Sequence, residues 1–166
     1  MPETTQLAMI GPTADPHAFS DSLTGLPDRR VLDRWPVDPI GRGASSIRAV
    51  LWVDIDALSG VNDVAGYAVG DALLVQFAAR LHQCLRPGDV LVRLGGDEFA
   101  LGLSDVSVET ATAIGERIVQ LAGEPFRIGT QTVNVTASVG LGMSGQRQTE
   151  APIGLLLSLG CAAMRE

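Results

Sequence analysis

The stretch that decides the fold is Arg93-Leu94-Gly95-Gly96-Asp97-Glu98-Phe99, in which two glycines and two acids follow one another. Apolar runs at 90–92 and 99–101 flank it, and this pattern predicts a β-hairpin with a tight turn. Glycine is needed where the backbone adopts a positive φ or comes close to a ligand. Adjacent carboxylates are costly to hold together unless a cation neutralises them. An exposed acidic turn without a ligand is the alternative.

A second acidic pair, in Asp54-Ile55-Asp56, directly follows the apolar run 47–53. Such a run is typical of a strand that is buried on both faces. Carboxylates at the end of a buried strand are well placed to bind a hard cation, because Mg²⁺ takes oxygen ligands and keeps substrate phosphates in its shell. Alternatively, Asp54 or Asp56 caps the helix that follows.

Helical periodicity and strand-like runs alternate along the chain. The expected helices cover residues 28–35, residues 69–85 with an apolar stripe for the core, a segment capped by Asp105 or Ser107 that runs to Ala122, and a segment from near Ala151. The expected strands cover 47–53, the two arms of the hairpin, 126–128 and 133–141. A loop is expected over 36–46. The order β-α-β-β-α-β predicts an α+β, ferredoxin-like fold with an antiparallel sheet flanked by helices.

Composition indicates one domain of a reducing compartment. A chain of 166 residues is large enough for a proper core. No apolar run approaches the ~20 residues that span a bilayer, and residues 1–11 lack the basic region of a signal peptide. Cys84 and Cys161 have no metal-type spacing and are typical of core cysteines. We therefore expect a cytoplasmic protein.

The net charge of −7 argues against DNA or RNA as a partner, because nucleic-acid backbones require a basic patch. An acidic domain can still bind a nucleoside triphosphate when divalent cations bridge the charges. The chain has no lysine, and all 12 basic residues are arginine. Side-chain contacts to phosphate must therefore come from arginine, which can bind in a bidentate manner, or from hydroxyl groups.

The segment Asp21-Ser22-Leu23-Thr24-Gly25-Leu26-Pro27-Asp28-Arg29-Arg30 resembles the D-x-L-T-G-L-x-N-R-R opening of the GGDEF, or diguanylate cyclase, domain. The family's further motifs follow in its order and approximate spacing, at Asp54-Ile55-Asp56, Asn62-Asp63, Gly66, Gly70-Asp71 and residues 95–99. The resemblance implies a palm-type sheet and a GGDEF domain over residues 21–166 whose C-terminal end is truncated. Residues 1–20 would then be an N-terminal tail or linker.

The activity that the resemblance implies is condensation of two GTP molecules into cyclic di-GMP with loss of pyrophosphate. Asp54, the backbone carbonyl of Ile55 and Asp97 would hold Mg²⁺ or Mn²⁺, which lowers the pKa of the attacking hydroxyl and neutralises phosphate charge. Asp97 would also be the base that helps remove the 3′-OH proton, and Glu98 would support the acidic cluster. Gly95 and Gly96 would leave room for the nucleotide over the turn.

Asn62 and Asp71 match the family's guanine-reading positions. An amide oxygen and a carboxylate suit this base, whose N1–H and N2–H₂ groups are donors. The alternatives are a turn at Asn62-Asp63 and a helix N-cap at Asp71. Because one domain binds one GTP, the product requires two facing active sites, and we expect a homodimer. A sensory or effector domain in the parent protein would act through effective concentration.

Arg86-Pro87-Gly88-Asp89 resembles the family's R-x-x-D inhibitory site, where dimeric cyclic di-GMP binds. Arg86 suits the phosphates and the guanine edge of that ligand, and Arg117 is a candidate second arm. The alternative is a helix C-terminus with a favourable arginine and a Pro-Gly turn.

Three departures from the family pattern concern the triphosphate and its surroundings. Ser59 stands where a lysine is usual, Tyr67 stands where histidine is usual, and the chain stops at Glu166 before the family's closing lysine. A charged contact contributes about 1.5–3 kcal/mol, so weaker GTP binding is expected. The hypotheses are a working cyclase, or a catalytically weak module that binds GTP or cyclic di-GMP and regulates an attached domain. A palm-type cyclase with another product is a remoter reading, against which Asn62 and Asp71 argue.

Overall fold

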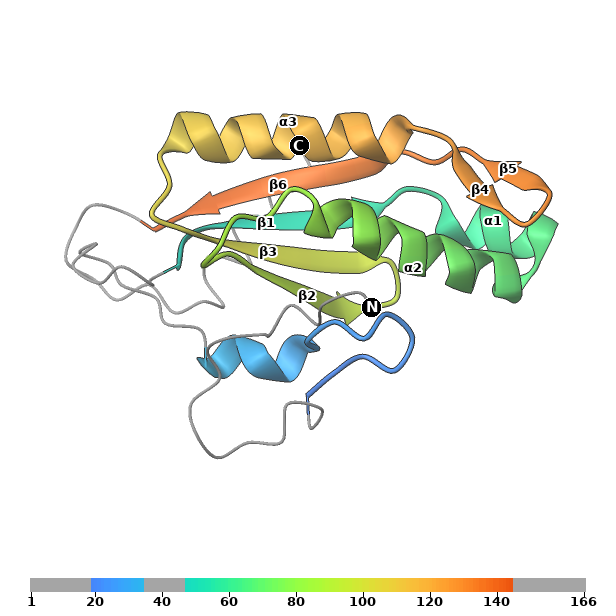
Figure 1. The fold of residues 1–166 in the computed structure, drawn as a ribbon, viewed down its shortest axis with the longest axis horizontal. Coiled ribbons are helices and arrows are strands. Elements are labelled where there is room, and N and C mark those ends of the chain that lie inside the picture. The colour runs from blue at the N-terminus through green and yellow to red at the C-terminus, as the bar shows by residue number, and fades with distance from the viewer. Residues whose placement is uncertain (1–18, 35–46, 145–166) are drawn as a thin grey trace, which may run out of the picture.

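A four-stranded antiparallel sheet forms the centre of the domain in the order β2-β3-β1-β6 (Figure 1). The structure is a computed structural model that describes residues 19–34 and 47–144. The strands are β1 (Ile47–Ile55), β2 (Val90–Gly95), β3 (Glu98–Ser104) and β6 (Ala137–Met143). The predicted hairpin and the α+β, ferredoxin-like arrangement are confirmed.

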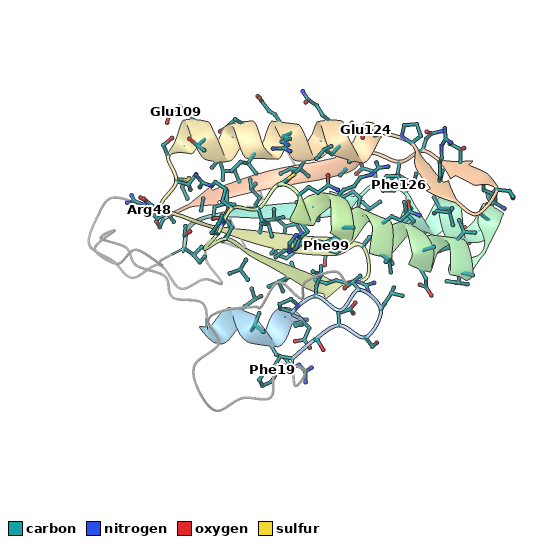
Figure 2. All side chains as sticks on the ribbon, viewed as in Figure 1. Phe19, Arg48, Phe99, Glu109, Glu124 and Phe126 are labelled. Carbon is teal, nitrogen blue, oxygen red and sulfur yellow. The ribbon has the colours of Figure 1, made fainter. Side chains whose placement is uncertain are left out.

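Helices α2 (Tyr67–His82) and α3 (Val108–Gly123) cover one face of this sheet, and α1 (Leu58–Ala65) packs beside α2 beyond the end of β1 (Figure 1). The predicted apolar stripe of α2 is confirmed as core, and Phe77 lies at its centre with 1% of its surface exposed. The ring of Phe77 lies 5.6 Å from that of Phe99 on β3 and 6.2 Å from that of Phe126, centroid to centroid. Figure 2 labels the latter two, Phe99 and Phe126. These contacts fasten α2 to the sheet and to the segment after α3.

The opposite face of the sheet is covered by the first described segment. Its 3₁₀ helix η1 (Arg29–Arg34) places Val31 and Leu32 against a second apolar cluster that includes Val50, Val92 and Ala100. The short helix expected over residues 28–35 is therefore present as a 3₁₀ helix. It brings the motif at residues 21–30 under the hairpin.

Two segments differ from expectation. The single strand expected over 133–141 is divided, because β5 (Gln131–Val133) pairs with β4 (Phe126–Ile128) in a separate two-stranded sheet, and β6 begins only at Ala137. The chain leaves the main sheet for this small hairpin and then returns to pair with β1. Helix α1 was not predicted, since it has only eight residues, with a glycine inside it and another at its end.

The ends of the other helices follow local chemistry. Helix α2 begins at Tyr67, two residues before its expected start, and ends at His82. Ser107 caps α3, because its hydroxyl accepts a hydrogen bond from the Thr110 backbone N–H at 3.2 Å. Asp105, the other candidate cap, has a φ of 43° and does not cap the helix.

Several expectations lie outside the described residues: most of the tail over 1–20, the loop over 36–46, the helix from near Ala151, Cys161 and the closing segment 160–166. Within 19–34 and 47–144, no helix is long and apolar enough to cross a membrane.

Candidate functional site

The signature turn joins β2 to β3 with two glycines in conformations that other residues rarely adopt. Gly95 has a φ of 142° and Gly96 a φ of 54°. The pairing of the two strands is irregular between Arg93 and Gly95, so the turn bulges before β3 begins at Glu98. Asp97 and Glu98 are half-buried, while both glycines are exposed. The turn therefore presents two acids beside an open stretch of backbone.

The Arg93 side chain holds this turn through hydrogen bonds. Its side chain is buried, with 9% exposed, and its Nε and Nη2 donate to the Gly96 carbonyl at 3.2 and 2.7 Å. Its Nη1 donates to the Asp21 carboxylate at 2.8 Å, and its backbone N–H donates to the Pro27 carbonyl at 2.9 Å. One guanidinium thus joins the opening motif to the turn, a role that the sequence reasoning missed.

The Asp21 carboxylate accepts several hydrogen bonds. Burial alone would raise its pKa, but hydrogen bonds from the Thr24 hydroxyl and backbone N–H, together with Arg93, hold the pKa below its usual range. This carboxylate is therefore satisfied within the protein and has a structural part in the opening motif.

The acids of the turn lie at the same sheet edge as Asp54. Asp54 on β1 is the register partner of Glu98 on β3, and the Ile55 backbone N–H donates to the Asp97 carbonyl at 3.2 Å. Burial, and then the charges of Asp97, Glu98 and Asp56, raise the pKa of Asp54 to about 6. The fold therefore concentrates negative charge at this edge, and no side chain within 19–34 and 47–144 forms an ion pair with Asp54, Asp97 or Glu98.

The chemistry of this edge suits a hard divalent cation. No three His, Cys, Asp or Glu side chains among the described residues are positioned to hold a metal by themselves. Mg²⁺ nevertheless needs only one or two carboxylates when substrate phosphates and water complete its shell. Asp54, Asp97 and the Ile55 carbonyl fit such a partial set. A divalent cation would also remove the repulsion that raises the pKa of Asp54.

Asp56 has a different part from Asp54. The Thr136 hydroxyl donates to its carboxylate at 2.5 Å and the Ser138 hydroxyl at 2.8 Å, while its own backbone N–H donates to the Thr136 carbonyl at 3.0 Å. Asp56 thus fastens the end of β1 to the start of β6. The residue at the N-cap of α1 is Ala57, which makes no side-chain cap, so the alternative that Asp54 or Asp56 caps this helix is wrong.

The two residues expected to read a base come from adjacent helices. Asn62 is in α1 and Asp71 is five residues into α2, so neither the turn nor the N-cap alternative is correct. Asp71 is exposed. The Oδ1 atom of Asn62 is buried and has no hydrogen-bond partner in the described part of the chain. A buried acceptor without a donor is costly, and this oxygen lies where α1 meets α2 at Gly70.

The Arg86–Asp89 turn is closed on itself. The Asp89 side chain is 1% exposed and accepts hydrogen bonds from the backbone N–H groups of Arg86 at 2.9 Å and Ser104 at 3.0 Å. Arg86 is 48% exposed, and its Nε lies 3.6 Å from Asp89. Asp89 therefore holds the turn, while the half-exposed Arg86 guanidinium lies beside it and donates from Nη2 to the Ser104 carbonyl at 3.4 Å.

Arg117 is exposed on α3. Burial raises the pKa of the Cys84 thiol, and the charge of Arg117 acts in the opposite direction. The structure shows no direct contact between Arg117 and Arg86 among the described residues, and their shared site stays a prediction.

The comparisons with known proteins agree with this geometry. The family described as "Diguanylate cyclase, GGDEF domain" matches residues 18–158. The probable diguanylate cyclase DgcE of Escherichia coli is 51% identical over 42% of this chain and 6% of its own length. The cyclic di-GMP phosphodiesterase PdeR of E. coli is 34% identical over 81% of the chain and 20% of its own length. The chain therefore spans a small part of these curated relatives.

A solved structure extends the agreement to three dimensions. The isolated GGDEF domain of TpbB from Pseudomonas aeruginosa superposes with a TM-score of 0.75 at 34% identity. The match covers 88% of this chain and 86% of that domain. With the family match over most of its length and this shared architecture, the chain belongs to the GGDEF domain family.

Proposed function

We propose that this domain is a diguanylate cyclase that condenses two GTP molecules into cyclic di-GMP and releases pyrophosphate. The observation that carries the proposal is the convergence of Asp54, Asp97 and Glu98 at one sheet edge beside a two-glycine turn. Phosphoryl transfer needs positioning and neutralisation of charge, and this edge provides ligands for the cations that do both.

Each residue of this edge has a role in the proposed reaction. Asp54, Asp97 and the Ile55 carbonyl would hold Mg²⁺ or Mn²⁺, which supplies Lewis-acid stabilisation of the phosphates when bound. Asp97 accepts the proton of the attacking 3′-hydroxyl, and Glu98 keeps the cluster acidic. The Arg93 clamp fixes the Gly96 carbonyl, so that the backbone of the turn is already in place when the nucleotide arrives.

Base selection is assigned to Asn62 and Asp71. The exposed Asp71 carboxylate is an acceptor, Asn62 adds a carboxamide from the neighbouring helix, and the Watson–Crick edge of guanine offers the N1–H and N2–H₂ donors. Adenine presents a different pattern and would leave a carboxylate unpaired. Asn62→Ala should therefore weaken GTP binding more than ATP binding in a titration. Equal loss for both nucleotides would show that Asn62 is only structural.

Two domains must meet for the product to form, because each binds one GTP. The proposal therefore includes a catalytic homodimer, assembled under the control of domains attached in the parent protein. Cyclic di-GMP would act back on the enzyme at Arg86, at the open end of the hairpin that carries the signature turn, with the exposed Arg117 of α3 as a candidate second arm.

The experiment is incubation of the purified domain with GTP and Mg²⁺, followed by chromatography of the nucleotides. Cyclic di-GMP should form, and its formation should require both the cation and Asp54. The Asp54→Ala variant is the matched control, because it removes a ligand without altering the turn. Cyclic di-GMP formed equally well by this variant would overturn the assignment of the metal site.

A second candidate is a regulatory module that binds GTP or cyclic di-GMP without turnover. Ser59 favours it, since this exposed position of α1 has no charge where the family has a lysine. The similarity to PdeR, which is named a phosphodiesterase, shows that such a domain also occurs in proteins named for the opposite activity. Binding of both nucleotides with no product after long incubation would support this candidate.

A further inference from the structure

Gly70 lies in α2 directly against the side chain of Asn62. A Cβ atom at position 70 would lie 1.8 Å from the Asn62 Oδ1 and 3.0 Å from its Cγ. Gly60 in α1 and Gly123 in α3 differ, because a Cβ at either position would meet nothing within 4 Å. The carboxamide of Asn62 therefore occupies the space that a side chain at position 70 would fill.

A glycine inside a helix is unfavourable relative to alanine, so this one calls for a reason. Position 70 is buried four residues into α2, where the helix has already formed its first turn. The atom that a Cβ here would meet is the Asn62 Oδ1 of α1. Among the described residues it is the only side-chain oxygen that is buried without a hydrogen-bond partner. The space left by the missing Cβ at position 70 is thus the space that the unpartnered Asn62 oxygen fills.

We propose that Gly70 is a positioning residue for base specificity: the absence of a side chain there lets the Asn62 carboxamide lie against α2, beside Asp71. This inference rests on the proposed function, in which both residues read guanine. Asp71 follows Gly70 directly, so the contact places the Asn62 carboxamide of α1 against the residue of α2 that precedes the second base-reading position. An amide from α1 and a carboxylate from α2 would then contact one base.

The expected effect of Gly70→Ala follows from which atom is displaced. The overlapping oxygen is the end of a flexible side chain, so the helix can stay in place while the carboxamide rotates away. The fold should survive, and the Asn62 carboxamide should leave the place from which it contacts the base. A Gly70→Ala variant is therefore predicted to behave as a partial loss of Asn62, although position 70 itself has no polar side chain to offer.

The test is a double-mutant cycle that measures affinity for a non-hydrolysable GTP analogue with Mg²⁺ by calorimetry. Gly70→Ala and Asn62→Ala should each weaken binding about tenfold, and the double variant should be no weaker than Asn62→Ala alone. Gly60→Ala, a matched glycine in the neighbouring helix, should bind like the parent. Additive losses in the double variant, or parent-like affinity in Gly70→Ala, would overturn the inference.

Thermal unfolding gives a second readout that does not depend on nucleotide. In the Asn62→Ala background, Gly70→Ala should raise the melting temperature, because alanine favours the helix and nothing opposes its Cβ. In the parent the same change should give a smaller gain or a loss, because the carboxamide must move. If Asn62→Ala binds the analogue like the parent, the base assignment in the proposed function fails. If only Gly70→Ala does so, this inference alone fails.

Discussion

The two ends of the β2–β3 hairpin carry similar residues in opposite conditions. At the turn, Asp97 and Glu98 face Asp54, and their charges and burial raise the pKa of Asp54 to about 6. At the open end, Asp89 is almost completely buried, yet its carboxylate accepts hydrogen bonds from Arg86 and Ser104. The carboxylates at the turn lack positively charged partners, whereas the carboxylate at the open end has its hydrogen-bond donors.

This difference assigns ligand binding to the turn and fold stability to Asp89 at the open end of the same hairpin. Acids that lack partners destabilise the empty protein and gain when a cation arrives. An acid whose partners are backbone N–H groups stabilises the fold and has little left to offer a ligand. We therefore assign recognition at the open end to the exposed Arg86, with Asp89 as the residue that holds its turn.

Removing the charge at the turn should have the largest effect. We expect Asp97→Asn to reduce the rate of pyrophosphate release from GTP by at least about 100-fold, because a metal ligand and the base are lost together. Its fold should remain intact by circular dichroism. Glu116→Gln, on the exposed side of α3, is the control and should keep the parent rate. A rate in Asp97→Asn equal to that of the parent would refute the role assigned to the turn.

The matched change at the open end should affect stability. Asp89→Ala leaves the Arg86 and Ser104 backbone N–H groups without their acceptor, and we expect a loss of about 2–3 kcal/mol in the free energy of unfolding. Urea denaturation measures this loss. Asp97→Ala, measured in parallel, should lose far less. Equal losses from the two variants would remove the contrast between the two ends.

Arg86 tests recognition at the open end. We expect Arg86→Ala to weaken cyclic di-GMP binding about tenfold, while it should lose less stability than Asp89→Ala, because the backbone N–H groups of residues 86 and 104 still donate to Asp89. Calorimetry in an Asp97→Ala background keeps turnover from supplying the ligand. Unchanged affinity would leave Arg86–Asp89 as a helix end with a tight turn and no ligand.

The smallest effect concerns pH. The pKa of Asp54 is raised from 3.8 to about 6 in the folded protein, so the folded state binds the proton more tightly. In metal-free protein this residue's contribution to stability should therefore increase as pH falls from 7 toward 5. Asp54→Asn should flatten that dependence and abolish stabilisation by Mg²⁺, as measured by melting temperature in chelator and in Mg²⁺. Asp21 does not enter this window, because its pKa is lowered.

The sheet, the hairpin and the acidic edge were predictable because their signals are local. An apolar run followed by acids fixes both a buried strand and what stands at its end, and two adjacent glycines fix the turn. The family pattern then placed Asn62 and Asp71 together, although local chemistry alone favoured a turn and a helix cap for them. The helices exclude the turn and the cap, while the base-reading role that the family resemblance implies stays a prediction.

The partners of the buried polar groups were not predictable. Asp56 receives its hydrogen bonds from residues 80 and 82 positions away, and Asp21 receives Arg93 from 72 positions away. Such pairs leave no periodicity or spacing in the sequence. The break between β5 and β6 was missed for the same reason, because the return of the chain to β1 depends on the tertiary fold.

The Arg93 guanidinium has a mechanical consequence. It is a planar, rigid group that is fastened at one corner to Asp21 and along another side to the Gly96 carbonyl. The opening motif and the signature turn are thus joined through one rigid guanidinium group, with few rotatable bonds between them. A displacement of the backbone near Asp21 should therefore also displace the turn, because the guanidinium between them is rigid.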